Sequence, residues 1–146
     1  MKKVLYTSIV LMLLLSNINF AQKPRVVNLD EAAIKKYLDN NALDEIEGIW
    51  KAYNQPSYNS YTFGIIKEDA HYIAIIITSE DKWKSGEIKA QIDLTSIKNV
   101  FSVKWGMGDK KTIREIFGNL ESAGLLTFNF GDGNGDRSYI RLYPLK

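Results

Sequence analysis

Residues 86–94 read "GEIKAQIDL" and alternate between apolar and polar side chains. The apolar positions are Ile88, Ala90, Ile92 and Leu94, and the polar positions are Glu87, Lys89, Gln91 and Asp93. A period of two is typical of a strand that buries one face and turns the other to water. We therefore expect a strand here, with its apolar residues in the core and Lys89 on the opposite face.

The same alternation recurs along most of the chain. "VFSVKW" at residues 100–105 and "LLTFNF" at residues 125–130 show it clearly. The pattern predicts strands at 48–53, 61–67, 72–78, 87–94, 100–105, 112–120, 125–130 and 138–143. Short connections favour antiparallel neighbours, and eight strands closed on themselves leave no exposed edge. The fold predicted is mainly β, an eight-stranded antiparallel up-and-down barrel.

The sixth segment, "TIREIFGNL" at residues 112–120, has two interpretations. Ile113, Ile116, Phe117 and Leu120 also have helical spacing, and Thr112 precedes Glu115 by three residues, as in a capping box. A helix here would reduce the number of strands. Glycine in mid-segment and the turn-like "ESAG" that follows favour a strand.

A helix is predicted before the strands, over residues 29–39. Asn28 and Glu31 have the spacing of a capping box, and two asparagines mark the end. Leu29, Ala33 and Tyr37, with Ala32 and Leu38 beside them, form its apolar stripe. The segment "YIAIII" at 72–77 is apolar on both faces, so its outer face needs a cover. The helix is the natural cover, and a subunit interface is the alternative.

The N-terminus resembles a secretory signal peptide. Two lysines precede an uncharged apolar run, and Ala21 suits a cleavage site, so we expect residues 1–21 to be removed. Residues 22–28 would form a linker and 29–146 a single domain. The chain has 19 basic residues; Lys2 and Lys3 leave with the signal, so 17 basic residues balance 17 acidic ones. A neutral domain favours neither nucleic acid nor a membrane surface as partner. A periplasmic or secreted location is expected, with no membrane anchor after cleavage.

Gly48 and Trp50 stand at the head of the first predicted strand, and Arg141 lies in the last one. Their placement in an eight-stranded barrel resembles the calycin superfamily, chiefly the lipocalins. The resemblance implies that Trp50 closes the barrel floor with Arg141 packed across it, a cation–π contact worth up to ~2 kcal/mol. The chain is also similar, more weakly, to β-rich accessory regions of secreted bacterial trypsin-like peptidases.

The lipocalin resemblance also implies a small apolar ligand inside the barrel. Phe63, Phe101, Trp105 and Phe128 would line the cavity, although the same residues could simply fill a solid core. Trp83, in the charged segment "SEDKWKSG", would be either a lid over the barrel mouth or an exposed anchor for a partner. As a loop residue it is expected to be nearly neutral for folding when replaced by alanine.

The sequence contains little that indicates a catalytic site or a metal site. His71 is the single histidine, no serine lies in a nucleophile elbow, and there is no cysteine, so neither a catalytic triad nor a zinc site is expected. The stretch "GDGNGDRS" spaces Asp132, Asn134 and Asp136 like a calcium loop, but it lacks the glycine and the glutamate that such a loop needs, which favours a hairpin turn. No cofactor is predicted. Three classes remain: a carrier of a small apolar ligand, a solid-barrel module that binds protein or carbohydrate, and, least supported, an enzyme.

Overall fold

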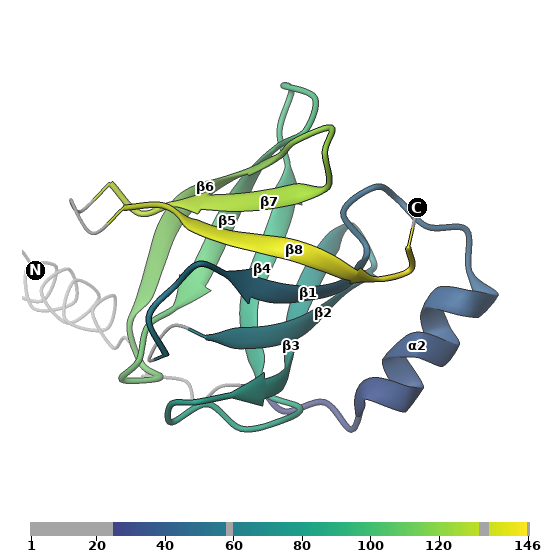
Figure 1. Cartoon of the computed structure of the whole chain (residues 1–146), viewed down its shortest axis with the longest axis horizontal. Helices are drawn as coiled ribbons and strands as arrows, with labels where there is room; N and C mark the ends of the chain where they lie inside the picture. Colours follow the sequence, from purple (N-terminus) through teal and green to yellow (C-terminus); the bar gives the residue numbers. More distant parts are fainter. Residues whose placement is uncertain (1–24, 58–59, 132–134, 146) are drawn as a thin grey trace, which may run out of the picture.

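The eight strands form one closed antiparallel barrel in chain order, and β8 pairs with β1. The structure is a computed structural model that describes residues 25–57, 60–131 and 135–145. Figure 1 shows the barrel and the helix α2 beside it. The strands are β1 (Gly48–Tyr53), β2 (Tyr61–Glu68), β3 (His71–Ser79), β4 (Ile88–Leu94), β5 (Val100–Gly106), β6 (Ile113–Leu120), β7 (Leu125–Asn129) and β8 (Arg137–Tyr143).

All eight predicted strands are confirmed, each within two residues of its predicted bounds. The sixth segment is a strand: Ile116 and Leu120 point into the barrel, whereas Ile113 and Phe117 are 60% and 63% exposed. The alternation of buried and exposed positions along β6 shows that its apolar residues follow a period of two. The predicted signal peptide lies outside the described residues. No described helix is both long and apolar enough to cross a membrane.

The two ends of the barrel differ in the segments that connect the strands there. The barrel mouth is the end at which loops 54–60, 80–87, 107–112 and 130–136 connect the strands. The barrel floor is the opposite end, with the turns at 69–70, 95–99 and 121–124 and the segment 41–47 that leads into β1. The C-terminus and α2 lie beside the floor (Figure 1).

The helix α2 (Glu31–Asn40) begins two residues later than predicted. Its N-cap is Asp30, whose side chain accepts a hydrogen bond of 2.8 Å from the backbone N–H of Ala33, so the expected capping box at Asn28 is wrong. The predicted apolar stripe is right at Leu38 but omits Ile34. These two are the buried residues of α2, and Ala33 and Tyr37 are half-buried.

The helix covers the outer cluster to which β3 contributes, as predicted, and its direct contact is with β2, where Ile34 packs against Gly64. Ile34 and Leu38 form a second apolar cluster with Ile73, Ile75 and Ile77, on the side of β3 that faces away from the barrel interior. The inward residues of β3 belong to the interior cluster instead. The doubly apolar strand therefore lies between two cores, one inside the barrel and one under α2.

Trp50 and Arg141 close the barrel floor as the resemblance implied. The guanidinium carbon of Arg141 lies 4.3 Å from the centre of the Trp50 ring, and the indole N–H donates to the carbonyl of Ile46 at 2.9 Å. Arg141 also donates to the backbone carbonyls of Glu45 and Glu47. A Cβ on Gly48 would lie 2.5 Å from Arg141 Nη1, so only glycine lets the arginine reach these carbonyls.

A β-bulge interrupts β4 at Lys89. Ala74 of β3 pairs with Ala90 and the next residue, Ile75, pairs with Ile88, so Lys89 has no partner of its own on β3. The extra residue reverses the alternation: Ile88 packs in the outer cluster, while Lys89 and Ala90 are both buried and Ala90 joins the interior cluster. The expectation that Lys89 faces away from the core is wrong for this reason. Leu94, expected in the core, is 64% exposed at the end of the strand.

Candidate ligand site at the barrel mouth

Aromatic rings fill the middle of the barrel. Phe63 lies 4.7 Å from Tyr139 and Trp105 lies 5.0 Å from Phe128, measured between ring centres. Tilted and T-shaped contacts of 5.7–6.4 Å join these pairs to one another. Contacts of this length are typical of packed aromatic side chains. Three of the four predicted wall residues thus form one cluster with Tyr139.

The fourth predicted wall residue, Phe101, lies elsewhere. It is buried in the interior cluster at the start of β5, near the floor, whereas Trp105 on the same strand lies near the mouth. Phe101 therefore contributes to the lower core and not to a site shared with Trp105.

Trp83 is buried, with 4% of its surface exposed, although it belongs to the loop between β3 and β4. Its ring crosses Gly106 at the end of β5, where a Cβ would come within 2.8 Å of the ring. Trp83 belongs to the interior cluster, so the interpretation as an exposed anchor is wrong. The ring covers the interior at the mouth, in agreement with the lid interpretation.

Asp81 holds the Trp83 loop in place. Its carboxylate accepts hydrogen bonds from the Ser79 hydroxyl at 2.6 Å, from the backbone N–H of Trp83 at 2.8 Å and from the Tyr61 hydroxyl. Burial alone would raise the pKa of Asp81, but these hydrogen bonds hold it below its usual range. Burial, and then the bond to Asp81, raise the pKa of Tyr61.

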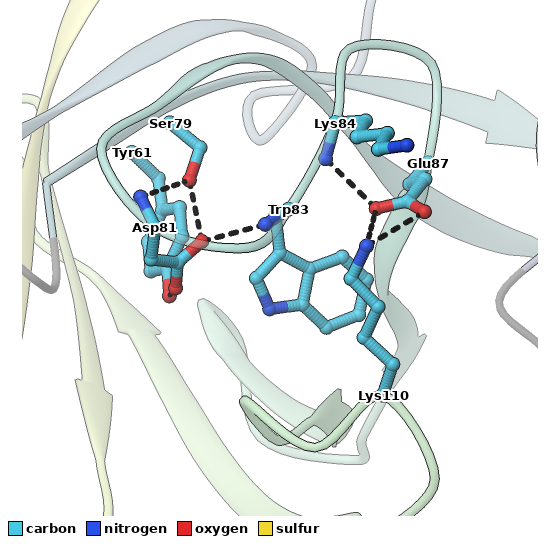
Figure 2. A network of polar contacts seen from close by, with 7 residues as sticks. All are labelled: Tyr61, Ser79, Asp81, Trp83, Lys84, Glu87 and Lys110. Atoms are coloured by element: carbon cyan, nitrogen blue, oxygen red, sulfur yellow. Dashed lines mark hydrogen bonds and ion pairs between the residues drawn. The ribbon is translucent and has the colours of Figure 1, made fainter.

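A second polar cluster lies on the other side of Trp83, as Figure 2 shows. Glu87 accepts a hydrogen bond from the backbone N–H of Lys84 at 2.8 Å, and it forms an ion pair with Lys110 Nζ at 2.7 Å. Lys110 belongs to the loop between β5 and β6, so the ion pair ties two mouth loops together. Trp83 is therefore held between two polar clusters.

Lys89 enters the barrel beneath this loop and is only 2% exposed. Its ammonium nitrogen lies over three ring faces, 4.1 Å from the centre of Trp83, 4.6 Å from Tyr61 and 5.1 Å from Trp105. No described carboxylate lies within 4.0 Å of it. Desolvation lowers the pKa of Lys89 to about 7, although the charge of Asp81 acts in the opposite direction.

Three buried polar atoms of the interior cluster have no hydrogen-bond partner in the described part of the chain. They are Trp83 Nε1, Trp105 Nε1 and the hydroxyl of Tyr139. A fourth such atom, Gln55 Oε1, belongs to the loop between β1 and β2 and not to the interior cluster. A buried polar group without a partner costs about 1–3 kcal/mol and needs a specific explanation.

Charged side chains of both signs surround this region. Arg137 lies 3.8 Å from the centre of the Phe130 ring, and Arg114 donates to the carbonyl of Phe130 at 2.6 Å. Arg137 and Lys110 act on Lys89 as like charges, and Asp81 and Glu87 act on it as opposite charges. The mouth loops also carry the acids Glu80, Asp109 and Asp136. Charge at the mouth is therefore mixed, and the preference for a ligand depends on the groups that surround Lys89 itself.

A groove of about 560 Å³ lies at the floor. It is lined by residues that include Lys98, Asn99, Leu120, Glu121, Arg141 and Leu145. The guanidinium of Arg141 already donates to backbone carbonyls and packs on the Trp50 ring. The groove is lined by both acidic and basic residues. The groove therefore has no convergent set of unpaired groups comparable with the mouth.

His71 lies at the floor end of β3, with Nε2 3.4 Å from the Glu68 carboxylate. It is far along the strand from the candidate site. Within the described ranges, no cluster of three or more His, Cys, Asp or Glu residues could hold a metal ion. Asp132 and Asn134 of the calcium-like stretch lie outside the described residues, and Asp136 directly precedes β8.

Comparison with protein families, with curated proteins and with solved structures finds no match for this chain.

Sequence reasoning identified Trp83 and Trp105 at this site but missed Lys89, Tyr61 and Tyr139. A lysine in an alternating strand normally faces water, and nothing in "GEIKAQIDL" marks the bulge that turns it inward. The two tyrosines occupy inward positions of predicted strands, where they were counted as part of the strand pattern.

Proposed function

We propose that the protein is an exported, lipocalin-like binding protein that holds a small ligand at the barrel mouth. The observation that carries the proposal is the group of unpaired polar atoms around Lys89, beneath Trp83. Buried donors without partners are costly, and a ligand with acceptor atoms would satisfy them. The aromatic rings around them suit an apolar ligand body. Export follows from the expected signal peptide, and no catalytic step is proposed.

The ligand would replace Trp83 above the interior. The packed rings of Phe63, Phe128 and Tyr139 fill the middle of the barrel, so the ligand would lie above them. Trp83 lies in a loop that is fixed by Asp81 and Glu87 on its two sides. Outward movement of this loop would open the space between Tyr61, Trp105 and Lys89.

A solid-barrel module that binds protein or carbohydrate is the second candidate. The tight packing of the central rings favours it, because such packing leaves the middle of the barrel to side chains. In that case Lys89 and its aromatic neighbours would form a closed internal contact.

Native mass spectrometry of the protein purified from its own host would separate the two candidates. We expect the folded protein to have a greater mass than the denatured chain, because a bound small molecule is released on denaturation. Equal masses in both states would contradict the carrier proposal and favour the solid-barrel module. The mass of the chain itself would show whether residues 1–21 have been removed.

A further inference from the structure

We propose that the ligand of the barrel mouth is a carboxylate and that Lys89 binds it. This inference rests on the proposed function, because it names the chemical class of ligand for the same site. It follows from the kinds of groups that converge beneath Trp83 and from the partners that the local acids already have.

The convergent groups are predominantly hydrogen-bond donors. An ammonium group offers three donors and no acceptor, and an indole N–H is a donor only. Lys89 and the unpaired indole of Trp105 therefore call for acceptor atoms once Trp83 has moved aside, and the Tyr139 hydroxyl can also donate. An amine or another cation would leave these donors unpaired and would meet the charge of Lys89.

The acids near Lys89 are occupied by other groups. The Asp81 carboxylate accepts from Ser79, Tyr61 and the backbone of Trp83. Glu87 is taken up by Lys110 and the backbone of Lys84. Lys89 is thus a buried cation with aromatic faces around it and no counter-ion in contact within the described residues. A ligand carboxylate would supply that counter-ion in a desolvated place, where charge-assisted hydrogen bonds are strong.

A carboxylate fits better than a phosphate group. Lys89 is the one ammonium that contacts all three rings, and the other unpaired donors there are neutral. One lysine can balance the single charge of a carboxylate, whereas a phosphate monoester carries nearly two charges at pH 7. A neutral carbonyl compound is the other class of ligand that could accept these hydrogen bonds, and binding experiments distinguish it from a carboxylate.

The test is a titration of the purified protein with octanoate, 1-octanol and octylamine, followed by tryptophan fluorescence and calorimetry. These probes share a chain and differ in their head group. We expect octanoate to bind about 10- to 100-fold more tightly than 1-octanol, and octylamine to bind most weakly. In the Lys89→Met variant the preference for octanoate should disappear, while 1-octanol binding changes little.

Lys104→Met is the matched control, because Lys104 lies on the neighbouring strand β5, on the exposed outer face of the barrel. It removes the same charge from the molecule without touching the mouth. We expect it to keep the preference for octanoate. Loss of the preference in both variants to the same extent would mean that net charge, and not Lys89, sets it, and would overturn the proposal.

The pH dependence of octanoate binding provides a test on the unmodified protein. Because the pKa of free Lys89 is lowered to about 7, binding should weaken by up to about tenfold per pH unit above pH 7, and 1-octanol binding should not. The charged or titratable groups that face Lys89 are Asp81, Glu87, Lys110, Arg137 and Tyr61. The pKa of Asp81 is lowered and that of Tyr61 is raised, so both shifts lead away from neutral pH. The only histidine lies at the floor.

The outcomes separate this inference from the function on which it rests. Equal affinity for octanoate and 1-octanol, or unchanged selectivity in Lys89→Met, would overturn the carboxylate assignment and leave a binder of neutral acceptors. Preferential binding of octylamine would also overturn it. If no probe binds and native mass spectrometry shows a bare chain, both the carboxylate assignment and the proposed function fail.

Discussion

The ammonium nitrogen of Lys89 lies 4.1 Å from the centre of the Trp83 ring, so a loop residue covers a lysine inside the barrel. The contact joins the two features that set this barrel apart from a simple apolar core. One is a charged group turned inward by a bulge, and the other is an aromatic lid held by polar contacts on both sides.

Replacing Trp83 by alanine should destabilise the protein by about 3 kcal/mol, because it opens a cavity above Gly106 and admits water to Lys89. The burial of Trp83 reverses the near-neutral effect expected from its loop position. Chemical denaturation monitored by circular dichroism would measure the change. Phe117→Ala, at an aromatic position that is 63% exposed on β6, is the control and should change stability by less than about 0.5 kcal/mol. Equal effects of the two variants would contradict the lid.

Lys89 should make stability depend on pH. Its pKa is about 7 in the folded protein and near 10.5 when unfolded, so the unfolded chain binds more protons between these values. The free energy of unfolding should therefore rise with pH between about 7 and 10, and Lys89→Met should lack this gain. At pH 6 we expect Lys89→Met to be more stable than the wild type. The difference in their free energies of unfolding should be smaller by roughly 1–3 kcal/mol at pH 9.5. Parallel pH profiles of the two proteins would show that Lys89 is not desolvated.

Trp50→Ala should cost ~3–5 kcal/mol, because Trp50 is fully buried and supports both Arg141 and the carbonyl of Ile46 at the floor. Tyr53→Ala is the control on the same strand, since Tyr53 is largely exposed at the other end of β1. Urea titration of both variants gives the comparison. A cost for Trp50→Ala as small as that for Tyr53→Ala would remove the structural role of the Trp50–Arg141 pair.

Ile34→Ala should destabilise the protein by ~2–5 kcal/mol, because Ile34 is fully buried between α2 and the outer face of the barrel at β2 and β3. Lys36→Ala, on the exposed side of the same helix, should have little effect. Thermal unfolding of the two variants would measure both. If Ile34→Ala unfolds at the same temperature as the wild type, packing of α2 on the barrel does not stabilise the protein.

The strands were predictable because most of them keep a strict alternation of apolar and polar residues. Trp50, Phe63, Trp105 and Phe128 all lie inside, as period-two counting requires. The cover over β3 was also predictable, since the run "YIAIII" has no polar face to turn to water. Local pattern and burial agree in these segments, so the sequence alone was sufficient.

The candidate site was only partly predictable, because its parts depend on contacts between distant segments. Trp83 lies among charged residues in the sequence, yet its ring is buried against Gly106, which follows more than twenty residues later. The burial of Lys89 depends on the pairing of β3 with β4, which no local pattern reports. The helix start was predicted from the spacing of Asn28 and Glu31, whereas Asp30 is the residue that caps α2.

The bulge has a consequence for how such a barrel can vary between relatives. Because Lys89 is the unpaired residue of β4, deleting it would leave Ile88 facing outward and Ala90 inward in a regular ladder. Every other residue would keep its register. A single-residue insertion or deletion at this position can thus add or remove the bulge and the interior lysine together. Barrels of this kind that lack the interior lysine should align to this chain with a gap at position 89.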